Sequence, residues 1–232
     1  MTSLGRGLVR AAAALSAVAV LGTALIGFAH TPWGRPLLGL PLFSALARRA
    51  GCPVGAIGPA AFERVRATKL RGEVGKEAAG AHPALGFTLG LSQRQEVERW
   101  AQSVAVSCRP GFVESVLECE DVKVQGSLPI AQLRLQFDGN NRLVGVDLFR
   151  SQAAAEALVS AFAASGRELD AQVGPATSSV GTASVADATA SPFKTVLRKY
   201  SYRDYVATLT LVNLGKRGLR LREQYGFVSP PA

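Results

Sequence analysis

Hydrophobic and polar residues alternate along much of the second half of the chain, and this pattern predicts β-strands. Leu133, Leu135 and Phe137 are separated by polar residues, and residues 143–150 repeat the alternation after a short Asp-Gly-Asn-Asn sequence. A period of two is typical of a strand with one buried face, and a turn sequence between two such runs favours a hairpin. Further strands are expected at 112–124, as two runs within 194–213, and at 219–224.

A second pattern, with apolar residues every three or four positions, predicts helices. One helix is expected over 93–104, where Ser92 and the glutamine three positions later have the spacing of a capping box. Another begins after Ser151, an expected N-cap, and Gly166 is expected to end or bend it. Residues 60–71 predict a short basic helix, interpreted either as an exposed linker helix or as a helix on a membrane surface.

The order of these elements predicts an α+β fold. Each of two successive segments opens with a helix, continues with three strands, and joins its last two strands through a glycine-containing turn. Two α-β-β-β units side by side would form one antiparallel sheet with both helices on one face. This domain is expected to cover 86–228. Within it, residues 174–192 are rich in Gly, Ala, Ser and Thr, and predict a flexible loop.

The most hydrophobic stretch lies near the N-terminus and predicts a transmembrane helix that precedes the domain. It runs from Ala11 to Ala29, nineteen residues without a charge, and is long enough to cross the hydrocarbon core of a bilayer. A cleaved signal peptide is the alternative, but the run exceeds the usual apolar region of a signal, so a retained anchor is favoured. Residues 1–30 are therefore interpreted as anchor or signal, and 31–85 as a basic juxtamembrane leader and linker.

Composition and charge narrow the classes of partner. The chain is 48% hydrophobic, which excludes wholesale disorder. Its net charge of +9 is uneven: residues 1–80 carry ten Lys and Arg against three Asp and Glu, and 194–232 carry eight against two. A basic segment beside a membrane favours attraction to anionic lipids. No nucleic-acid-binding motif accompanies these charges, so no nucleic-acid partner is expected.

Cysteine spacing bears on the compartment. Cys108 and Cys119 flank a loop that contains a Pro-Gly pair, which is a workable disulfide spacing. The alternative is that both are reduced and act as small buried hydrophobic residues. A disulfide requires an oxidising compartment, so the bonded reading places the domain in the periplasm, tethered to the inner membrane by a single span. Cys52 is then left without an intramolecular partner.

Short motifs in the domain resemble a known family. Residues 89–92 with Val97, followed by Val173-Gly174-Pro175, resemble the start of the helix and the Gly-Pro step in the small envelope domains of the SmpA/OmlA outer-membrane assembly lipoproteins. The layout is also similar to the tandem-repeat β-lactamase inhibitor protein. Both resemblances cover about residues 86–227 and imply a helix-on-sheet fold. The chain departs from the lipoproteins because its Ala-Gly-Cys sequence, ending at Cys52, lies far beyond the apolar run. Residues 30–35 alone resemble the opening of AsmA/TamB-type envelope proteins.

The sequence contains no recognised catalytic signature, and no catalytic, cofactor or metal residues are assigned. His30 and His82 both lie outside the predicted domain, so a Ser-His-Asp or Cys-His arrangement lacks a base. The densest carboxylates lie between Glu114 and Asp121, where a hydrolytic pair can be imagined. Glu118 and Glu120 would share one face of a strand, which favours solvated charges instead.

The candidate partner-binding residues are aromatic and basic. Tyr and Arg are common anchors of protein interfaces. The candidates are Tyr200, Arg203, Tyr205, Arg220 and Arg222. The basic residues near the C-terminus (Lys199, Arg203, Lys216, Arg217, Arg220 and Arg222) would give the bare face of the sheet a positive field. The alternative for the tyrosines is ordinary packing, with Tyr200 and Tyr202 on one face and Tyr205 on the other.

These features favour a non-catalytic, membrane-anchored envelope protein whose exported domain binds another envelope protein. Two alternatives stay open. One is an enzyme of unrecognised type with its site in the acidic cluster, and the other is a lipid-surface binder that acts through the basic leader.

Overall fold

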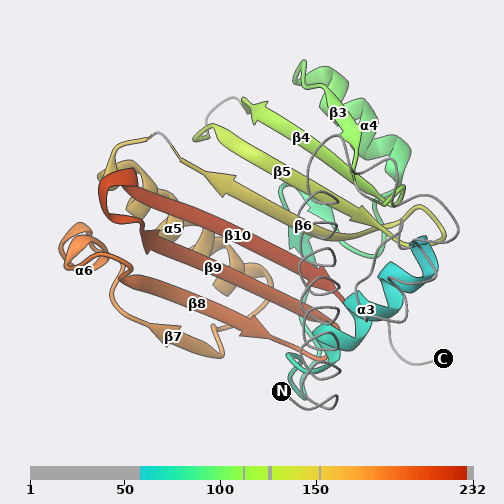
Figure 1. Cartoon of the computed structure of the whole chain (residues 1–232). Coiled ribbons are helices and arrows are strands. Elements are labelled where there is room, and N and C mark those ends of the chain that lie inside the picture. Colours follow the sequence, from blue (N-terminus) through green and yellow to red (C-terminus); the bar gives the residue numbers. More distant parts are fainter. Residues whose placement is uncertain (1–57, 112, 125–126, 152, 229–232) are drawn as a thin grey trace, which may run out of the picture. The chain divides into compact units, whose positions relative to one another are not determined.

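The computed structural model describes residues 58–111, 113–124, 127–151 and 153–228 (Figure 1). The expected membrane helix at 11–29 and Cys52 lie outside these residues. Among the helices that the structure does describe, none is long and apolar enough to cross a membrane.

One antiparallel sheet of eight strands organises the domain, in the order β3-β4-β5-β6-β10-β9-β8-β7 (Figure 1). The strands are β3 (Cys108–Pro110), β4 (Val116–Val122), β5 (Ile130–Phe137), β6 (Leu143–Arg150), β7 (Ser178–Val180), β8 (Thr195–Ser201), β9 (Tyr205–Asn213) and β10 (Leu219–Phe227). A separate two-stranded ribbon pairs β1 (Pro83–Ala84) with β2 (Phe87–Thr88). The α+β class and the large antiparallel sheet are thus confirmed.

Each half of the sheet follows a helix in the chain. Helix α4 (Arg94–Ser103) precedes β3 to β6, and α5 (Ala155–Gln172) precedes β7 to β10, with α6 (Val185–Thr189) inserted after β7. The last strand of each half, β6 and β10, pair at the centre of the sheet. Each half therefore has four strands where three were expected. The additional strands, β3 and β7, have three residues each, too few to show an alternation.

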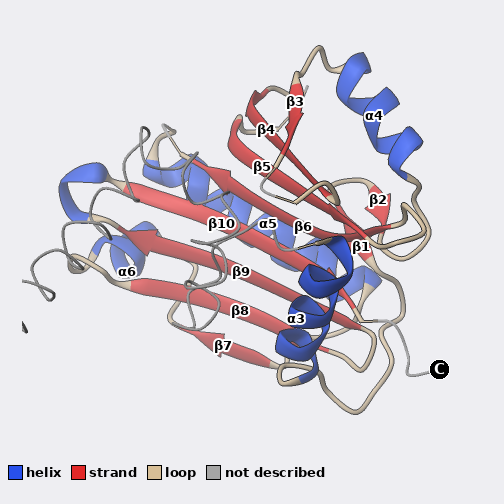
Figure 2. Ribbon diagram, turned by 45° about the vertical axis from the view of Figure 1, so that its right-hand side comes forward, coloured by secondary structure: helices blue, strands red, loops and turns tan. Residues whose placement is uncertain are grey.

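The hydrophobic core lies between the sheet and α5. Helix α5 packs on β9 and β10, and α6 packs on β8 and β9 (Figure 2). Leu158 and Phe162 of α5 and Leu209 of β9 are almost completely buried in this core. Helix α4 contributes Val97 to the same core. The alternation of the strands thus places their apolar side chains against the helices, as the sequence predicts.

Helix α3 (Pro59–Arg71) lies on the opposite face, so the helices do not all cover one side (Figure 2). Leu70 contacts the sheet at Gly226, where a side chain would meet it. Arg66 donates hydrogen bonds to the carbonyl oxygens of Val144 and Phe227, at 3.2 and 2.9 Å. The helix expected at 60–71 therefore packs on the domain. Its basic sequence does not reveal these backbone contacts, because they join it to strands distant in the chain.

The helix ends differ from those that the sequence predicts. The N-cap of α5 is Ala154, with no side-chain cap, and Ser151 lies before it. Gly166 does not end α5, which continues to Gln172. Its missing side chain instead leaves room for Arg198, which pairs with Asp170 of the same helix at 2.8 Å. The capping box of α4 is not formed either, because Gln93 is its N-cap.

The segment expected to be a flexible loop, 174–192, contains β7 and α6. Strand β7 pairs with β8, and Ser184 caps α6 by accepting a hydrogen bond from the N–H of Asp187. Asp187 in turn accepts a hydrogen bond from the N–H of Thr182 and pairs with Lys194 at 3.1 Å. These contacts hold the pKa of Asp187 below its usual range, the bond from Thr182 most of all. Local capping thus orders a segment of low hydrophobicity.

The chain before β1 is fastened to the turn between β8 and β9. Asp204 accepts a hydrogen bond from the N–H of Ala79 at 2.9 Å, and its other oxygen lies 3.0 Å from Nε2 of His82. The N–H of Arg203 donates to the carbonyl oxygen of Glu77. His82, expected to lie in a linker, is therefore part of the domain.

The disulfide between Cys108 and Cys119 is confirmed. The two residues face each other across β3 and β4, with Cα atoms 4.3 Å apart. The bond fastens the three-residue edge strand β3 to its neighbour, which backbone hydrogen bonds alone would hold weakly.

Replacing Cys108 and Cys119 together by alanine should lower the free energy of unfolding by about 3 kcal/mol, because the unfolded chain regains the entropy of the closed loop. Urea denaturation of the full chain measures the difference, with wild type in the presence of reductant as a second comparison. Equal midpoints for all three samples would show that the bond contributes nothing to stability.

Acid should destabilise the contact at Asp204. Burial raises the pKa of this carboxyl, but the hydrogen bonds from Ala79 and His82 outweigh it, so the folded pKa is lowered. A carboxyl with a lowered folded pKa contributes stability that is present above its unfolded pKa, about 4, and is lost as the pH falls through the folded value. Wild type should therefore lose more stability than Asp204→Asn between pH 6 and pH 3, measured by urea unfolding. Equal losses would contradict the assignment.

Candidate functional site

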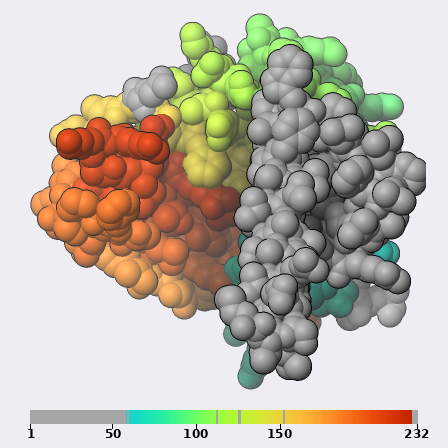
Figure 3. All heavy atoms as spheres, in the orientation of Figure 1, coloured from blue at the N-terminus to red at the C-terminus, as the bar shows by residue number. Residues whose placement is uncertain are grey.

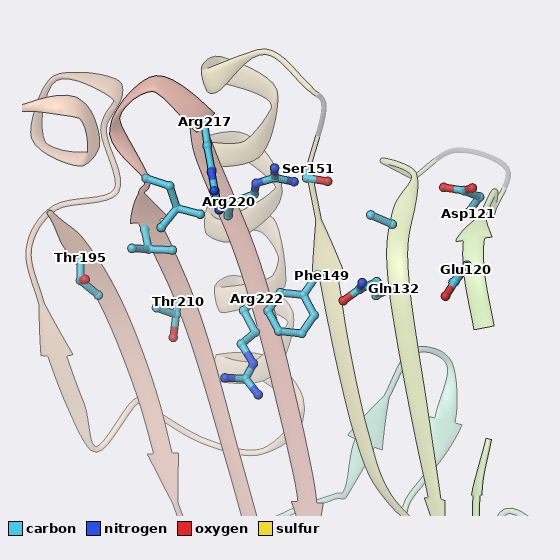
Figure 4. A pocket seen from close by; sticks show the side chains of 13 residues that line it. Glu120, Asp121, Gln132, Phe149, Ser151, Thr195, Thr210, Arg217, Arg220 and Arg222 are labelled. Carbon is cyan, nitrogen blue, oxygen red and sulfur yellow. The ribbon is translucent and has the colours of Figure 1, made fainter. Parts of the chain in front are cut away.

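The face of the sheet opposite α5 carries a basin at the end that α3 does not cover. Its volume is about 790 Å³, and it extends over strands from β4 to β8 (Figure 4). The lining residues are Glu120, Asp121, Ala131, Gln132, Phe149, Ser151, Thr195, Thr210, Val212, Leu214, Arg217, Arg220 and Arg222. Figure 3 shows this face, with the turn before β10 at its left edge. We call this feature the open-face basin.

The floor of the basin is a mixed apolar and hydroxyl surface. Phe149 of β6, Arg222 of β10 and Thr210 of β9 lie in one row across three neighbouring strands. Val212 of β9 and Thr195 of β8 lie opposite each other in the next row. All five side chains are half-buried. The floor can thus contact apolar groups and also donate hydrogen bonds.

Arg222 belongs to the framework of the basin. Its Nε and Nη2 donate to the two carboxylate oxygens of Asp147, at 2.9 and 2.6 Å. Its guanidinium lies 4.8 Å from the centre of the Phe149 ring. The hydrogen bond with Asp147 raises the pKa of Arg222 further, so its charge is constant and neutralised by its neighbour. This pair holds the aromatic ring in the floor.

Two other arginines supply the positive charge of the basin. Arg220 precedes Arg222 by two residues on β10, and Arg217 ends the 3-10 turn η2 (Gly215–Arg217). Within the described part of the chain, no acidic side chain forms an ion pair with either of them. Both lie at the end of the basin near η2, whereas Arg222 points away from them (Figure 4).

Fewer basic side chains than the sequence indicates contribute positive charge to the basin. Lys199 pairs with Glu73 at 3.2 Å, and Arg222 pairs with Asp147. Arg203 lies in the turn between β8 and β9, at the opposite end of the sheet from Arg220. These pairings leave Arg217 and Arg220 as the positive end of the basin.

The opposite wall of the basin carries two carboxylates, from Glu120 and Asp121 of β4. Glu120 pairs with Arg109 at 2.8 Å, which offsets its charge and leaves Asp121 as the main negative group of this wall. Glu118 lies on the same face of β4 as Glu120 and pairs with Arg134 at 2.9 Å. These carboxylates are the cluster that the sequence singles out. No group of three or more metal-ligating side chains occurs among the residues that the structure describes.

Tyr200 and Tyr205 do not belong to this surface. Both are fully buried, at 0% exposed, on the helix side of the sheet. The hydroxyl of Tyr200 donates to the carbonyl oxygen of Gly166 at 2.9 Å, and that of Tyr205 donates to Pro83 at 2.6 Å. Burial raises the pKa of both hydroxyls. Because the turn at 202–204 separates two strands, alternation counted from β8 does not continue into β9.

Of the residues of the floor, sequence reasoning identified Arg222 and missed Phe149, Thr195, Thr210 and Val212. One signal was present, because Phe149 occupies an outward position in the alternation of 143–150, where Asp147 also lies. An aromatic residue at an outward-facing position becomes informative only when its neighbours across the strands form a contiguous surface with it, and the sequence does not reveal those neighbours. Thr195 and Thr210 carry no such signal, since threonine is common in strands.

Charge reversal should destabilise the fold at Arg222 but not at Arg220, although both residues lie on β10. Arg222→Glu should lower the free energy of unfolding by about 1 to 3 kcal/mol, because it places a like charge against Asp147, which is only 12% exposed. Arg220→Glu should change it by less than about 0.5 kcal/mol. Urea denaturation tests this, and equal losses for the two variants would contradict the roles assigned here.

Comparison with known proteins gives no match for this chain, whether among family models, curated proteins or solved structures.

Proposed function

We propose that this chain is a non-catalytic, membrane-anchored protein of the cell envelope whose domain binds another envelope protein through the open-face basin. The observation that carries the proposal is the make-up of the basin. A half-buried floor with an aromatic ring and hydroxyl groups lies beside Arg217 and Arg220. Arginine and aromatic side chains around a surface from which a partner can exclude water are typical of the hot spots that supply most of the binding energy of a protein interface.

The breadth of the basin favours a macromolecular partner. Its lining residues come from strands β4, β5, β6, β8, β9 and β10 and from the segment around η2. Sites for small molecules usually enclose most of the ligand, whereas the residues that line this basin are spread along the sheet, from Glu120 and Asp121 to Thr195 (Figure 4). A broad, open face with separated groups of charge suits a partner that can contact several strands at once.

The charges of the basin would orient such a partner. Arg217 and Arg220 mark one end, and Glu120 and Asp121 mark the other. Complementary charges raise the rate of encounter and fix the register of a complex more than they tighten it. Added salt should therefore slow association.

The proposed location follows from two features. The disulfide between Cys108 and Cys119 is favoured by an oxidising compartment such as the periplasm. Residues 11–29 are proposed to form a single transmembrane helix in the inner membrane, which tethers the domain.

The two helix-plus-strand halves of the domain are proposed to be related units that share one sheet.

A photo-crosslinking amino acid in place of Thr210, in the floor, should capture one discrete partner in intact cells. The membranes are washed with carbonate, and mass spectrometry identifies the adduct. The matched control carries the crosslinker at Ala164, on the exposed side of α5. Arg220→Glu should reduce the yield from position 210 about tenfold at low salt, because it reverses the positive end of the basin.

The same adduct from positions 210 and 164, or an unchanged yield with Arg220→Glu, would contradict binding through the basin. Release of the full chain by the carbonate wash would contradict the membrane tether separately.

A further inference from the structure

Phe193 is an exposed aromatic residue in an unfavourable backbone conformation. It has a φ of 63° and its side chain is 76% exposed. Positive φ is uncommon for residues other than glycine and asparagine, and for a bulky side chain it is a clear outlier. An exposed phenyl ring adds no burial that would offset this cost. Asparagine or glycine at position 193 would therefore stabilise this loop more than phenylalanine does.

Hydrogen bonds hold Phe193 in this conformation. Its N–H donates to the carbonyl oxygen of Asn213 at 2.7 Å, and the N–H of Asn213 donates to Lys194 at 2.9 Å. The side-chain amide of Asn213 donates to the carbonyl oxygen of Ser191 at 3.0 Å. The loop is thus fixed to the end of β9 on both sides of the phenylalanine. Strained residues that the surroundings hold in place cluster at functional sites.

The position of Phe193 connects it with the open-face basin. Thr195, two residues later, lines the basin, and its hydroxyl donates to the carbonyl oxygen of Phe193. Leu214, next to Asn213, lines it as well. Phe193 is not itself a lining residue, but its backbone is hydrogen-bonded to Thr195 of the lining and to Asn213, which precedes Leu214 of the lining. The loop that carries it therefore adjoins the basin on the side of β8 and β9.

We propose that Phe193 is the apolar anchor of this site, and that it packs against an aromatic or aliphatic side chain of an acidic segment of the partner protein. The carboxylates of that segment lie against Arg217 and Arg220. This inference rests on the proposed function and adds the chemistry of the partner. An exposed aromatic residue on a loop that adjoins the basin, together with the arginines of the basin, would combine two kinds of residue that are common in interface hot spots. Its fixed backbone means that little conformational entropy is lost on binding.

A membrane surface is the competing occupant, and the structure favours it less. Insertion into a bilayer requires a broad apolar face, and Phe193 has only Pro192 as an apolar neighbour, between the polar residues Ser191 and Lys194. The carboxylate of Asp121 would also face anionic lipids across the basin.

Two fluorescein-labelled peptides test the proposal with the full chain in non-ionic detergent. One has the sequence Asp-Glu-Asp-Trp-Asp-Glu-Asp, and the other has glycine in place of tryptophan. Fluorescence anisotropy should show that wild type binds the tryptophan peptide about tenfold more tightly. Phe193→Asn should remove this preference while its thermal midpoint equals or exceeds that of wild type, because asparagine tolerates positive φ. Phe193→Tyr should keep the preference, and Leu91→Asn, at a residue 71% exposed outside the basin, should change nothing.

The outcomes separate this inference from the proposed function. Suppose that Phe193→Asn still prefers the tryptophan peptide, while Arg220→Gln binds both peptides less tightly. Phe193 is then not the apolar anchor, but the proposal that the basin binds the partner stands. If wild type binds neither peptide, or Arg220→Gln weakens neither, both proposals fail. If wild type but not Phe193→Asn sediments with vesicles of anionic phospholipid, and neither peptide binds, the loop contacts membrane and the proposal is overturned.

Discussion

A buried ion pair between Arg150 of β6 and Glu223 of β10 lies where the two halves of the sheet meet. The side chains are 9% and 4% exposed, and Nε of Arg150 lies 2.7 Å from Oε1 of Glu223. The other carboxylate oxygen accepts hydrogen bonds from Tyr225, at 2.6 Å, and from Ser165 of α5. Arg150 also donates to the carbonyl oxygen of Leu128. A charge buried in an apolar core is tolerated only when it is paired and hydrogen-bonded in this way. Backbone pairing joins β6 and β10, and loss of either charged partner would leave an uncompensated charge buried at their junction.

The two faces of the sheet use their polar groups differently. On the helix face, the carboxylate of Glu223 and the hydroxyl of Tyr200 form hydrogen bonds within the domain. On the opposite face, α3 covers one end and the basin occupies the other. The floor of that basin takes Phe149 from one half and Arg222 from the other, so it exists only because β6 and β10 are paired. The buried ion pair and the floor of the basin therefore lie on opposite faces of the same pair of strands, β6 and β10.

Much of the sheet could be predicted from the sequence, because alternation is a local signal that burial on one face imposes. The hairpin of β5 and β6 was predicted from alternation and a turn sequence, and the spacing of Cys108 and Cys119 favoured the disulfide over two reduced cysteines. The docking of α3 could not be predicted, since Arg66 reaches backbone carbonyls distant in the sequence. The burial of Tyr200 and Tyr205 could not be predicted either, because it depends on which helix covers which strand. For the site, local patterns identified Arg220 as outward-facing but did not reveal its neighbours across the sheet.

The central claim is that the open-face basin is covered by a protein partner in the envelope. Hydroxyl-radical footprinting measures this directly, because it oxidises accessible side chains in native membranes and in the purified full chain alike. The account predicts that Phe149, Phe193 and Leu214 are oxidised in the purified chain and protected in native membranes. Leu91 and Val65, exposed and outside the basin, should be oxidised equally in both samples. Equal oxidation of the basin residues in the two samples would contradict the account.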